Sequence, residues 1–320
     1  MKPTRRILIL LLIGLSGAVL NSLFLEAGGQ PAQHPDTTGP GQRSGQAAQS
    51  REPPLGGPGE VLQRAIIELE RLRSLSAKTR QRVELFGTPL VGTGRYFEQR
   101  TPQGLDLRLE LSLQGERVSS LVQVCRGPYL WICRDKEPPV RIDVNRVARA
   151  LEEEGEVFEP GRIGAWPGLG GLPKMLRGLH ASFDFTGIES TWLGEQLPVY
   201  RLRGEWKQEK LSRILNQPQR TPREPRPGDW DKIPPHLPHY VVLYLERDKL
   251  FPRRIEYRRY ASQALQDQPV KEDPTIVSID VFDVVLNPPI NPKWFSFDPG
   301  DREVTDQTNR FLGTLGLKKK

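Results

Sequence analysis

The sequence predicts an α+β protein built around an antiparallel β-sheet, on the basis of three observations. Residues 104–117 place a leucine at every second position from 105 to 113, with polar residues between them. A period of 2 is typical of a β-strand with one apolar and one polar face. Turn signals, Gly115-Glu116 and Gly127-Pro128, follow at short spacing, and an amphipathic helical pattern precedes the strands. Burial of the apolar face would contribute about 10 kcal/mol, and its residues are Leu105, Leu107, Leu109, Leu111 and Leu113.

Charge and cysteine content argue against a nucleic-acid-binding protein and against a disulfide-rich protein. The 320 residues are enough for one large domain or two small ones. The net charge of +7 comes from both signs spread along the chain, which allows contact with anionic lipid. No nucleic-acid-binding motif accompanies this charge, so we expect a solvated basic surface and no nucleic-acid partner. Two cysteines are too few for a disulfide framework.

The N-terminus has the pattern of an export segment. Three basic residues precede an apolar run at 7–20, as in a secretory signal peptide. Ala27 offers only a poor cleavage site, and the run is long enough for a membrane anchor if it is read through to residue 25. We therefore expect residues 1–27 to be a signal peptide or an N-terminal membrane anchor. Either alternative places the rest of the chain in the periplasm or cell envelope.

A linker separates the export segment from the folded domain. Residues 28–59 are rich in Gly and Pro with almost no apolar side chains, which predicts a disordered linker. The folded domain is therefore expected over 60–320. It begins with a helix at 60–74, whose apolar residues fall on one stripe. Strands are predicted at 79–86 and 91–99, before the leucine strand.

The register of the next two strands follows from the expected turns. With Gly115-Glu116 as a two-residue hairpin tip, Leu113 faces Val118 and Leu107 faces Val124. With a second tip at Gly127-Pro128, Val124 in turn faces Trp131. The predicted apolar face then combines the leucines with Val118, Val122, Val124, Trp131 and Cys133.

The same register places Cys125 and Cys133 on opposite faces of the sheet. Their side chains then point apart, so we expect two unpaired thiols rather than an internal disulfide. A pair of cysteines in a strand hairpin is typical of small-residue packing rather than of catalysis or metal binding.

The middle of the chain predicts two helices joined by a mobile flap. A short helix is expected at 144–151, capped by Asp143 and ending in an acidic cluster that we interpret as solvated. Residues 161–171 are rich in glycine but lack the Lys-Ser/Thr of a phosphate-binding loop. We interpret them as a lid, followed by a helix with Pro173 in its first turn. The predicted lid residues are Trp166, Leu169, Leu172, Met175 and Leu176.

The second half of the chain returns to strands. Residues 240–245 form an almost unbroken apolar run, which predicts a central strand covered on both faces. A short helix is expected at 208–215, and an irregular, proline-rich segment at 216–238. The other predicted strands lie at 183–185, 189–193, 199–204, 254–260 and 275–286, with a last one through Phe295 and Phe297.

Few residues suggest catalysis or metal binding. His236 and His239 lie three positions apart, but two histidines without a third ligand are weak grounds for zinc, and we expect no metal. No Ser/His/Asp constellation, paired-carboxylate motif or activated nucleophile is found, so we expect neither enzymatic activity nor a cofactor. Four arginines are interpreted as strand-edge charge that opposes aggregation, with lipid headgroups as an alternative partner, namely Arg253, Arg254, Arg258 and Arg259.

Four stretches of sequence carry a resemblance to a known family. They are SSLVQVCRGPYLW at 119–131, LPVYRL at 197–202, FPRRI at 251–255 and NPKWFSFDPG at 291–300. In this order, after an exported N-terminus and an amphipathic helix, they resemble the LolA/LolB-like superfamily of periplasmic lipoprotein carriers. The resemblance implies a single curved antiparallel sheet, a half-barrel, with helices packed on its concave face. It also implies an apolar cavity for acyl chains.

The functional expectation is a non-enzymatic, monomeric envelope protein that binds lipid or lipoprotein acyl chains beneath the lid and associates with membranes. Two alternatives stay open. In the first, the apolar face is ordinary core. In the second, the same fold serves as a membrane-tethered sensor or protein-interaction module. Room above Leu107 and Leu109 would distinguish a carrier from ordinary core. The expected ligand-binding residues are Leu105, Leu107, Leu109, Leu111, Val122, Val124 and Trp131.

Overall fold

The computed structural model describes residues 56–85, 88–114, 118–135, 137–153, 170–215, 230–235, 237–261 and 273–314. The expected export segment, nearly all of the linker, the lid residues Trp166 and Leu169, and His236 lie outside these ranges. Within them the helices are α3 (Pro58–Arg71), α4 (Val144–Glu153), α6 (Gly171–Ser182), α7 (Gln208–Ile214), η4 (Pro292–Phe295) and α9 (Thr308–Thr314). The strands are β1 (Ser74–Leu85), β2 (Thr88–Thr101), β3 (Gly104–Gln114), β4 (Ser119–Arg126), β5 (Tyr129–Arg134), β6 (Val140–Asp143), β7 (Phe183–Leu193), β8 (Leu197–Trp206), β9 (Tyr240–Glu246), β10 (Pro252–Arg258), β11 (Thr275–Leu286) and β12 (Thr305–Asp306).

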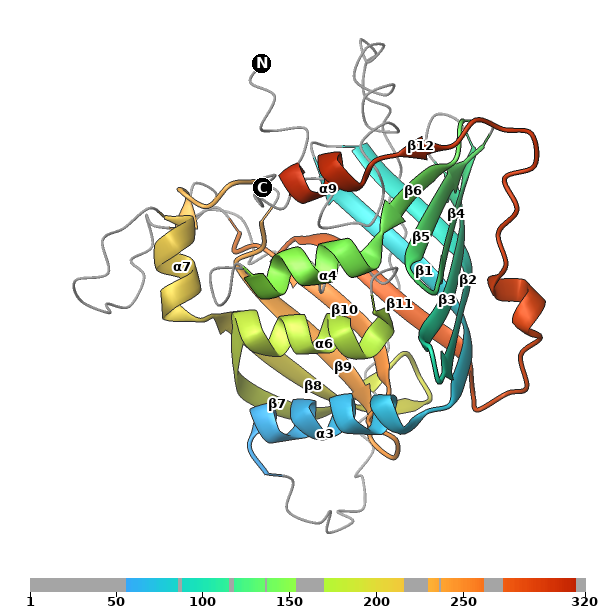
Figure 1. Cartoon of the computed structure of the whole chain (residues 1–320). Coiled ribbons are helices and arrows are strands. Elements are labelled where there is room, and N and C mark those ends of the chain that lie inside the picture. Colours follow the sequence, from blue (N-terminus) through green and yellow to red (C-terminus); the bar gives the residue numbers. More distant parts are fainter. Residues whose placement is uncertain are drawn as a thin grey trace, which may run out of the picture.

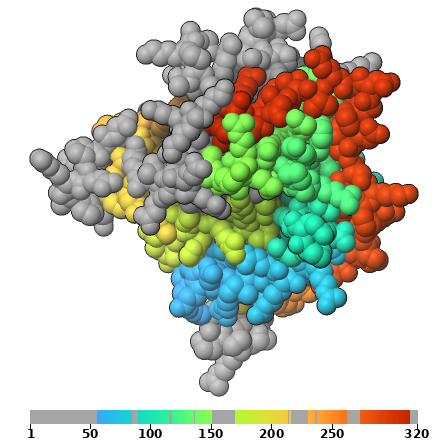
Figure 2. Space-filling view, viewed as in Figure 1, coloured from blue at the N-terminus to red at the C-terminus, as the bar shows by residue number. Residues whose placement is uncertain are grey.

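The twelve described strands form one sheet (Figure 1). Its order is β12-β6-β5-β4-β3-β2-β1-β11-β10-β9-β8-β7, so two meanders meet where β1 pairs with β11. Every neighbouring pair is antiparallel except β12 with β6. The sheet curves around α3, α6 and α4, which cover its concave side (Figures 1 and 2). The predicted fold class, a single curved antiparallel sheet with helices on its concave face, is confirmed.

The concave side holds the main hydrophobic core. The predicted first helix is confirmed, but it ends at Arg71 because Leu72 is extended. Its buried stripe follows the helical period and consists of Val61, Leu62, Ala65, Ile66 and Leu69. The same core includes side chains of α6, which are Leu172, Met175, Leu176 and Leu179.

β3 is the strand that the leucine pattern predicts. Four of its leucines are only 1–3% exposed and belong to the concave core, and these are Leu107, Leu109, Leu111 and Leu113. Between them, Arg108 and Glu110 form an ion pair (Nε–Oε1 2.6 Å) on the other face of the sheet. The period of 2 therefore identifies both the strand and its buried face.

The predicted register between β3 and β4 is wrong by one residue. Leu113 pairs with Ser119 rather than Val118, and Leu107 pairs with Cys125. A two-residue tip does not fit this pairing, because residues 114–118 separate the last pair. A slip of one residue turns every side chain of the strand to the other face. The predicted register puts four residues on the leucine face that in the structure lie on the convex face. They are Val122, Val124, Trp131 and Cys133.

The chain's own C-terminal segment covers these convex-face residues. After β11 the chain passes outside the sheet, through η4, before it returns to β12 (Figure 1). The ring of Phe297 lies 5.2 Å from that of Trp131, centroid to centroid. Trp294 makes an edge-on contact of 4.7 Å with Phe97, and Phe295 is completely buried. Val124 and Cys133 are thus buried, and Trp131 packs against the chain's own C-terminal segment.

The predicted last strand through Phe295 and Phe297 is wrong. Residues 292–295 form a turn of 3-10 helix. Pro292 occupies its start, where a missing N–H costs nothing, and the Asn291 side chain accepts a hydrogen bond from the Lys293 N–H (3.0 Å). The alternation of two phenylalanines is too short to outweigh this capping signal.

The two cysteines are free and buried. Cys125 lies in the concave core, whereas Cys133 pairs across from Val122 and so faces the convex side. The expectation of two unpaired thiols on opposite faces is confirmed, although the register error exchanges the faces. Burial raises the pKa of the Cys125 thiol to about 11, with a further contribution from Asp106.

The arginines of β10 do not lie on a strand edge, so that prediction is wrong. β10 pairs with β9 on one side and β11 on the other. Arg254 binds Asp280 (Nε–Oδ1 2.5 Å), and Arg253 binds Glu246 (Nε–Oε2 2.8 Å). Their charge is therefore used in cross-strand pairs on an interior strand.

Several boundaries also differ from the prediction. β1 begins at Ser74, because Leu75 and Ala77 continue the buried alternation towards the N-terminus. β6 and β12 are short strands with little alternation, and the sequence does not predict them. β9 is buried along both faces, as its apolar run predicts. Among the described residues, no helix combines the length and apolarity that would be needed to cross a bilayer.

Candidate functional site

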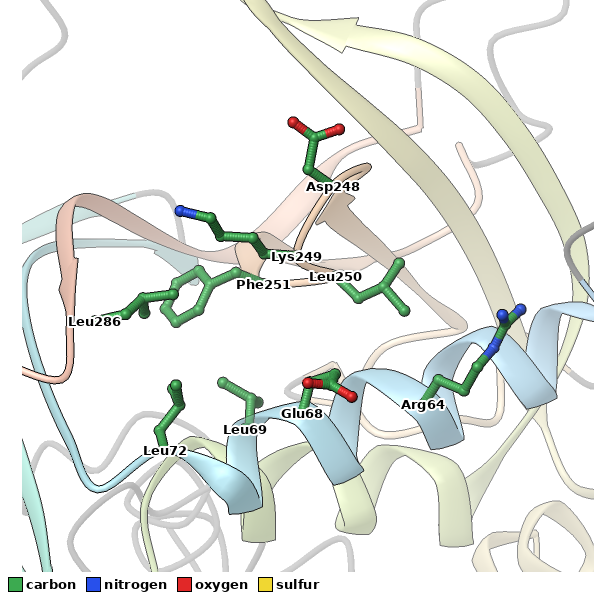
Figure 3. A pocket seen from close by; sticks show the side chains of 9 residues that line it. All are labelled: Arg64, Glu68, Leu69, Leu72, Asp248, Lys249, Leu250, Phe251 and Leu286. Carbon is green, nitrogen blue, oxygen red and sulfur yellow. The ribbon is translucent and has the colours of Figure 1, made fainter. Parts of the chain in front are cut away.

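A cavity of about 420 Å³ opens between α3, the turn from β9 to β10 and the end of β11 (Figure 3). This volume lies in the range of small-molecule sites, which is about 300–1,000 Å³. Figure 3 shows Leu69 and Leu72 pointing from α3 towards Phe251 and Leu286. The nine lining residues come from distant parts of the sequence, and they are Arg64, Glu68, Leu69, Leu72, Asp248, Lys249, Leu250, Phe251 and Leu286.

Helical spacing builds the α3 wall of the cavity. Arg64 and Glu68 are four residues apart on α3, so they lie on one side of the helix, and Leu72 directly follows its last residue. Glu68 forms an ion pair with Arg71 (Oε1–Nη1 2.6 Å). Among the described residues, Arg64 has no ion-pair partner, so its guanidinium is available to a ligand.

The turn from β9 to β10 builds the opposite wall. Its backbone is closed by two hydrogen bonds, from Leu250 N–H to Glu246 O and from Glu246 N–H to Phe251 O (both 2.9 Å). Leu250 has a φ of +50°, a conformation that costs a side-chain-bearing residue roughly 1–2 kcal/mol. The turn accepts this cost at a residue that lines the cavity.

The cavity is lined by both apolar and charged side chains, and each of its two walls carries both kinds (Figure 3). Five of the nine lining residues are apolar, and the charged ones are Arg64, Glu68, Asp248 and Lys249. The two cations and two carboxylates cancel in net charge. A largely apolar pocket with a few polar groups suits an amphipathic ligand. Among the described residues, no group of three or more His, Cys, Asp or Glu side chains is arranged to hold a metal ion.

The leucines predicted to bind ligand lie in the protein core. Leu107, Leu109 and Leu111 are covered by the chain's own side chains, in one cluster with residues of α3 and α6. Leu105 is half-buried, and none of the β3 leucines lines the cavity. Their burial is what the ordinary-core alternative predicts, and their contact with a ligand stays a prediction.

The other predicted ligand-binding residues lie on the convex face of the sheet rather than on the concave face. Val122, Val124 and Trp131 are convex, because of the one-residue slip described above. Val124 is 1% exposed, and Trp131 packs against Phe297. None of these residues lines the cavity.

The described lid residues form a packed helix. Leu172, Met175 and Leu176 lie on the buried face of α6, at most 4% exposed. The predicted stripe is confirmed, whereas the role of these residues as part of a lid stays a prediction. Trp166 and Leu169 lie outside the described residues.

A buried polar group, which sequence reasoning missed, lies beneath the start of α6. Tyr96 donates to Glu98 (Oη–Oε2 2.6 Å) and accepts a hydrogen bond from the Leu172 N–H (3.2 Å). Burial raises the pKa of the Glu98 carboxyl, against the opposing effects of the Tyr96 hydrogen bond and Arg100. Gly171, at φ +69°, permits this approach, because a Cβ there would lie 2.4 Å from Oε2 of Glu98. The group therefore fixes the position of α6 on the sheet.

His239 is a packed residue with a defined hydrogen bond. Its Nδ1 accepts the Tyr260 N–H (2.9 Å), and its ring lies 5.3 Å from the ring of Trp230. Burial, together with the charge of Arg259, lowers its pKa to about 4. The imidazole is therefore neutral at physiological pH.

Sequence reasoning also missed the cavity residues. Leu72 is the last residue of the apolar stripe predicted for the helix at 60–74, and Leu250-Phe251 follows the apolar strand β9. Each could be recognised as apolar, but their convergence depends on the pairing of β9, β10 and β11. The resemblance implies a cavity without giving its position.

No protein-family model and no curated protein matches the sequence. Solved structures similar to the chain include an uncharacterized conserved protein from Thermus thermophilus, with a TM-score of 0.41 and 12% identity over 77% of this chain and 97% of that one. The MucA/MucB complex of Pseudomonas aeruginosa gives a TM-score of 0.37 and 12% identity over 75% of this chain and 61% of that one. A LolA superfamily protein from Nitrosomonas europaea gives a TM-score of 0.29 and 8% identity over 76% of this chain and 99% of that one. The curved antiparallel sheet with helices on its concave face, which the resemblance implies, is the fold that the structure has.

Proposed function

We propose that this protein binds the acyl chain of a lipid or lipoprotein and makes no covalent change to it. The observation that supports the proposal is the cavity between α3 and the β9–β10 turn, whose lining combines five apolar residues with four charged ones. The core beneath, including the leucine face of β3, holds α3 against the sheet and so shapes one wall. The N-terminal pattern supports a place in the cell envelope.

The chemistry of the cavity fits an amphipathic lipid. Burial of about eight methylenes would contribute about 6 kcal/mol, at ~0.8 kcal/mol each. Among the lining residues, Arg64 and Lys249 can bind a phosphate or carboxylate, and Glu68 and Asp248 can bind an amine. A lipid headgroup supplies such groups, whereas a purely apolar ligand would leave these charges without a role.

Filling the cavity tests the proposal. We expect Leu72→Trp and Leu250→Trp to weaken binding of a fluorescent long-chain fatty acid to the full chain. Displacing about three methylenes costs about 2.4 kcal/mol, or roughly fifty-fold in the dissociation constant. Fluorescence titration measures the constant, and circular dichroism with thermal unfolding checks that each variant is folded.

The matched control is Ile67→Trp, because Ile67 lies on α3 but is 38% exposed and does not line the cavity. This variant should bind the fatty acid as the wild type does. Unchanged binding by both folded cavity-filling variants would contradict the proposal. A wild type that binds no fatty acid would do the same, and would favour the alternative of an interaction module.

A further inference from the structure

Three large apolar side chains lie exposed on the outside of the sheet, near the end of β11. They are Phe282 (39% exposed), Val285 (53%) and Trp294 (45%), and we call them the outer patch. Phe282 and Val285 belong to β11, and Trp294 belongs to η4, which runs along the convex side (Figure 1).

A β-bulge places Phe282 and Val285 on the same face. Phe282 pairs with Lys78 and Val285 pairs with Ser76, and the register shifts between these two pairs. Residues three apart in a regular strand point to opposite faces, so without the bulge one of the two would enter the core. Asp283 lies in the irregular stretch at φ +48°, and its carboxylate binds Lys78 (Oδ2–Nζ 2.8 Å). The backbone is thus arranged to keep two apolar side chains in solvent.

Trp294 continues the patch across the next strands. Phe97 and Val285 both pair with Ser76, and Trp294 packs edge-on against Phe97 with centroids 4.7 Å apart. Ser76, which lies between Val285 and Phe97 in the sheet, has a small side chain. Arg108 donates from Nη1 to the Trp294 carbonyl (3.0 Å). The indole is therefore held from beneath while its outer side stays exposed.

Cations without carboxylate partners accompany the patch. Arg95 lies opposite Lys78 on β1 and opposite Glu110 on β3, and Lys293 directly precedes Trp294. Both are exposed, and neither has an ion-pair partner among the described residues. Lys78 and Arg108, in contrast, bind Asp283 and Glu110. The surroundings of the patch therefore carry positive charge, within a chain of net charge +7.

We propose that the outer patch docks this protein on the surface of an anionic phospholipid bilayer. Indole and other apolar side chains partition into the headgroup region, where Arg and Lys meet lipid phosphates. The two unpartnered cations give a preference for anionic over zwitterionic lipid. Three side chains form too small a surface for a standard protein–protein interface, which buries about 800 Å² on each partner.

Docking in this way brings the cavity close to the bilayer. Leu286 lines the cavity, and the preceding residue, Val285, belongs to the outer patch. Successive strand residues point to opposite faces, so one strand separates the patch from the cavity. A lipid would then enter or leave the cavity beside the membrane. The docking itself does not depend on the acyl-chain proposal.

A local probe tests the docking in the full chain, because the apolar N-terminal run could itself bind vesicles. We place a polarity-sensitive fluorophore on Val285→Cys and, as the control, on Trp192→Cys. Trp192 is similarly exposed, at 58%, and lies on β7 at the far end of the strand order. Wild-type protein treated in parallel measures background labelling of the buried native cysteines.

Vesicles containing phosphatidylglycerol and phosphatidylcholine should shift the emission at position 285 to shorter wavelength. The label at position 192 should not respond, and phosphatidylcholine alone should give a much smaller shift at 285. Arg95→Ser and Lys293→Ser should each raise the lipid concentration for half-maximal signal about five-fold. Leu72→Trp should leave the signal at 285 unchanged, which separates docking from occupancy of the cavity.

Three results would overturn the proposal. No shift at position 285 with anionic vesicles would show that the patch does not reach lipid. Equal shifts at 285 and 192 would show that the N-terminal run alone is responsible. A shift that follows protein concentration without lipid would identify a second copy of this chain as the occupant of the patch.

Discussion

Gly171 lies at the point where α6 comes closest to the sheet. Replacing it with alanine would bring a Cβ within 2.4 Å of Glu98 Oε2 and 2.9 Å of Tyr96 Oη. The positive φ of +69° adds a conformational cost of about 1 kcal/mol for any residue with a Cβ. We expect Gly171→Ala to lower the free energy of unfolding by about 2–3 kcal/mol, measured by urea denaturation.

Gly127 provides a control for the conformational part of this effect. It has a φ of +57°, but a Cβ there would have no atom within 4 Å. Gly127→Ala should therefore cost only about 1 kcal/mol. Equal losses in the two variants would show that the close approach to Glu98 and Tyr96 does not constrain α6.

At the scale of the element, Asp280 joins three neighbouring strands. Its carboxylate on β11 accepts from Arg80 on β1 (3.0 Å) and from Arg254 on β10 (2.5 Å). Asp280→Asn removes the charge that both guanidinium groups share, in a side chain that is only 12% exposed. We expect a loss of about 1–3 kcal/mol in unfolding free energy, measured by chemical denaturation.

Asp283 on the same strand is the matched control. Its ion pair with Lys78 is more than half exposed on both partners, so it contributes about 0–1 kcal/mol. Asn also tolerates the positive φ of this position. If Asp283→Asn costs as much as Asp280→Asn, the bridging position of Asp280 has no special value.

Element type was predictable where a pattern was long and consistent. The alternation in β3 and the helical stripe of α3 each give the correct element and the correct buried face. The register from β3 to β4 was not predictable, because it depends on the length of one connection. That single residue decides whether Val124 or Cys125 joins the leucines. The incorrect prediction of a strand through Phe295 and Phe297 shows the same limit, since the Asn291 cap and Pro292 outweigh a short alternation.

At the scale of the whole molecule, the buried groups His239 and Glu98 make the free energy of unfolding depend on pH in opposite directions. The pKa of His239 is lowered to about 4 in the folded state, so the unfolded chain takes up this proton first. The contribution of His239 to the free energy of unfolding is therefore lost as pH falls from about 6.5 towards 4. The pKa of Glu98 is raised above 4.5 by burial, so its contribution is instead lost as pH rises through the folded-state pKa.

His239→Asn should make the protein less sensitive to acid. The amide oxygen can still accept the Tyr260 N–H that Nδ1 accepts in the wild type. Between pH 7 and pH 5, we expect the wild type to lose about 2 kcal/mol more unfolding free energy than the variant. Urea unfolding at the two pH values measures the difference.

Glu98→Gln should have the opposite effect on the same measurement. It removes a group that favours the folded state at low pH, so the fall in stability on acidification becomes steeper. An identical pH dependence in the wild type and both variants would show that neither group is titrated differently in the two states.

The candidate site illustrates what the sequence alone does not determine. Its walls come from α3, the β9–β10 turn and β11, and no local pattern connects Leu72 with Phe251 or Leu286. Their meeting depends on the pairing of β1 with β11. The fold class and the buried leucine face could be predicted, whereas a cavity formed by three distant segments depends on the complete topology.

The pairing of β1 with β11 also has a consequence for how the chain folds. Arg80 and Asp280 are 200 positions apart, so the middle of the sheet forms only after nearly the whole chain is present. Until then β1 is an open edge, and open edges invite intermolecular pairing. Lys78, Arg80 and Arg82 place a cation at every second residue along that edge. We therefore expect these charges to oppose aggregation of the partly folded chain, before they become part of the outer surface.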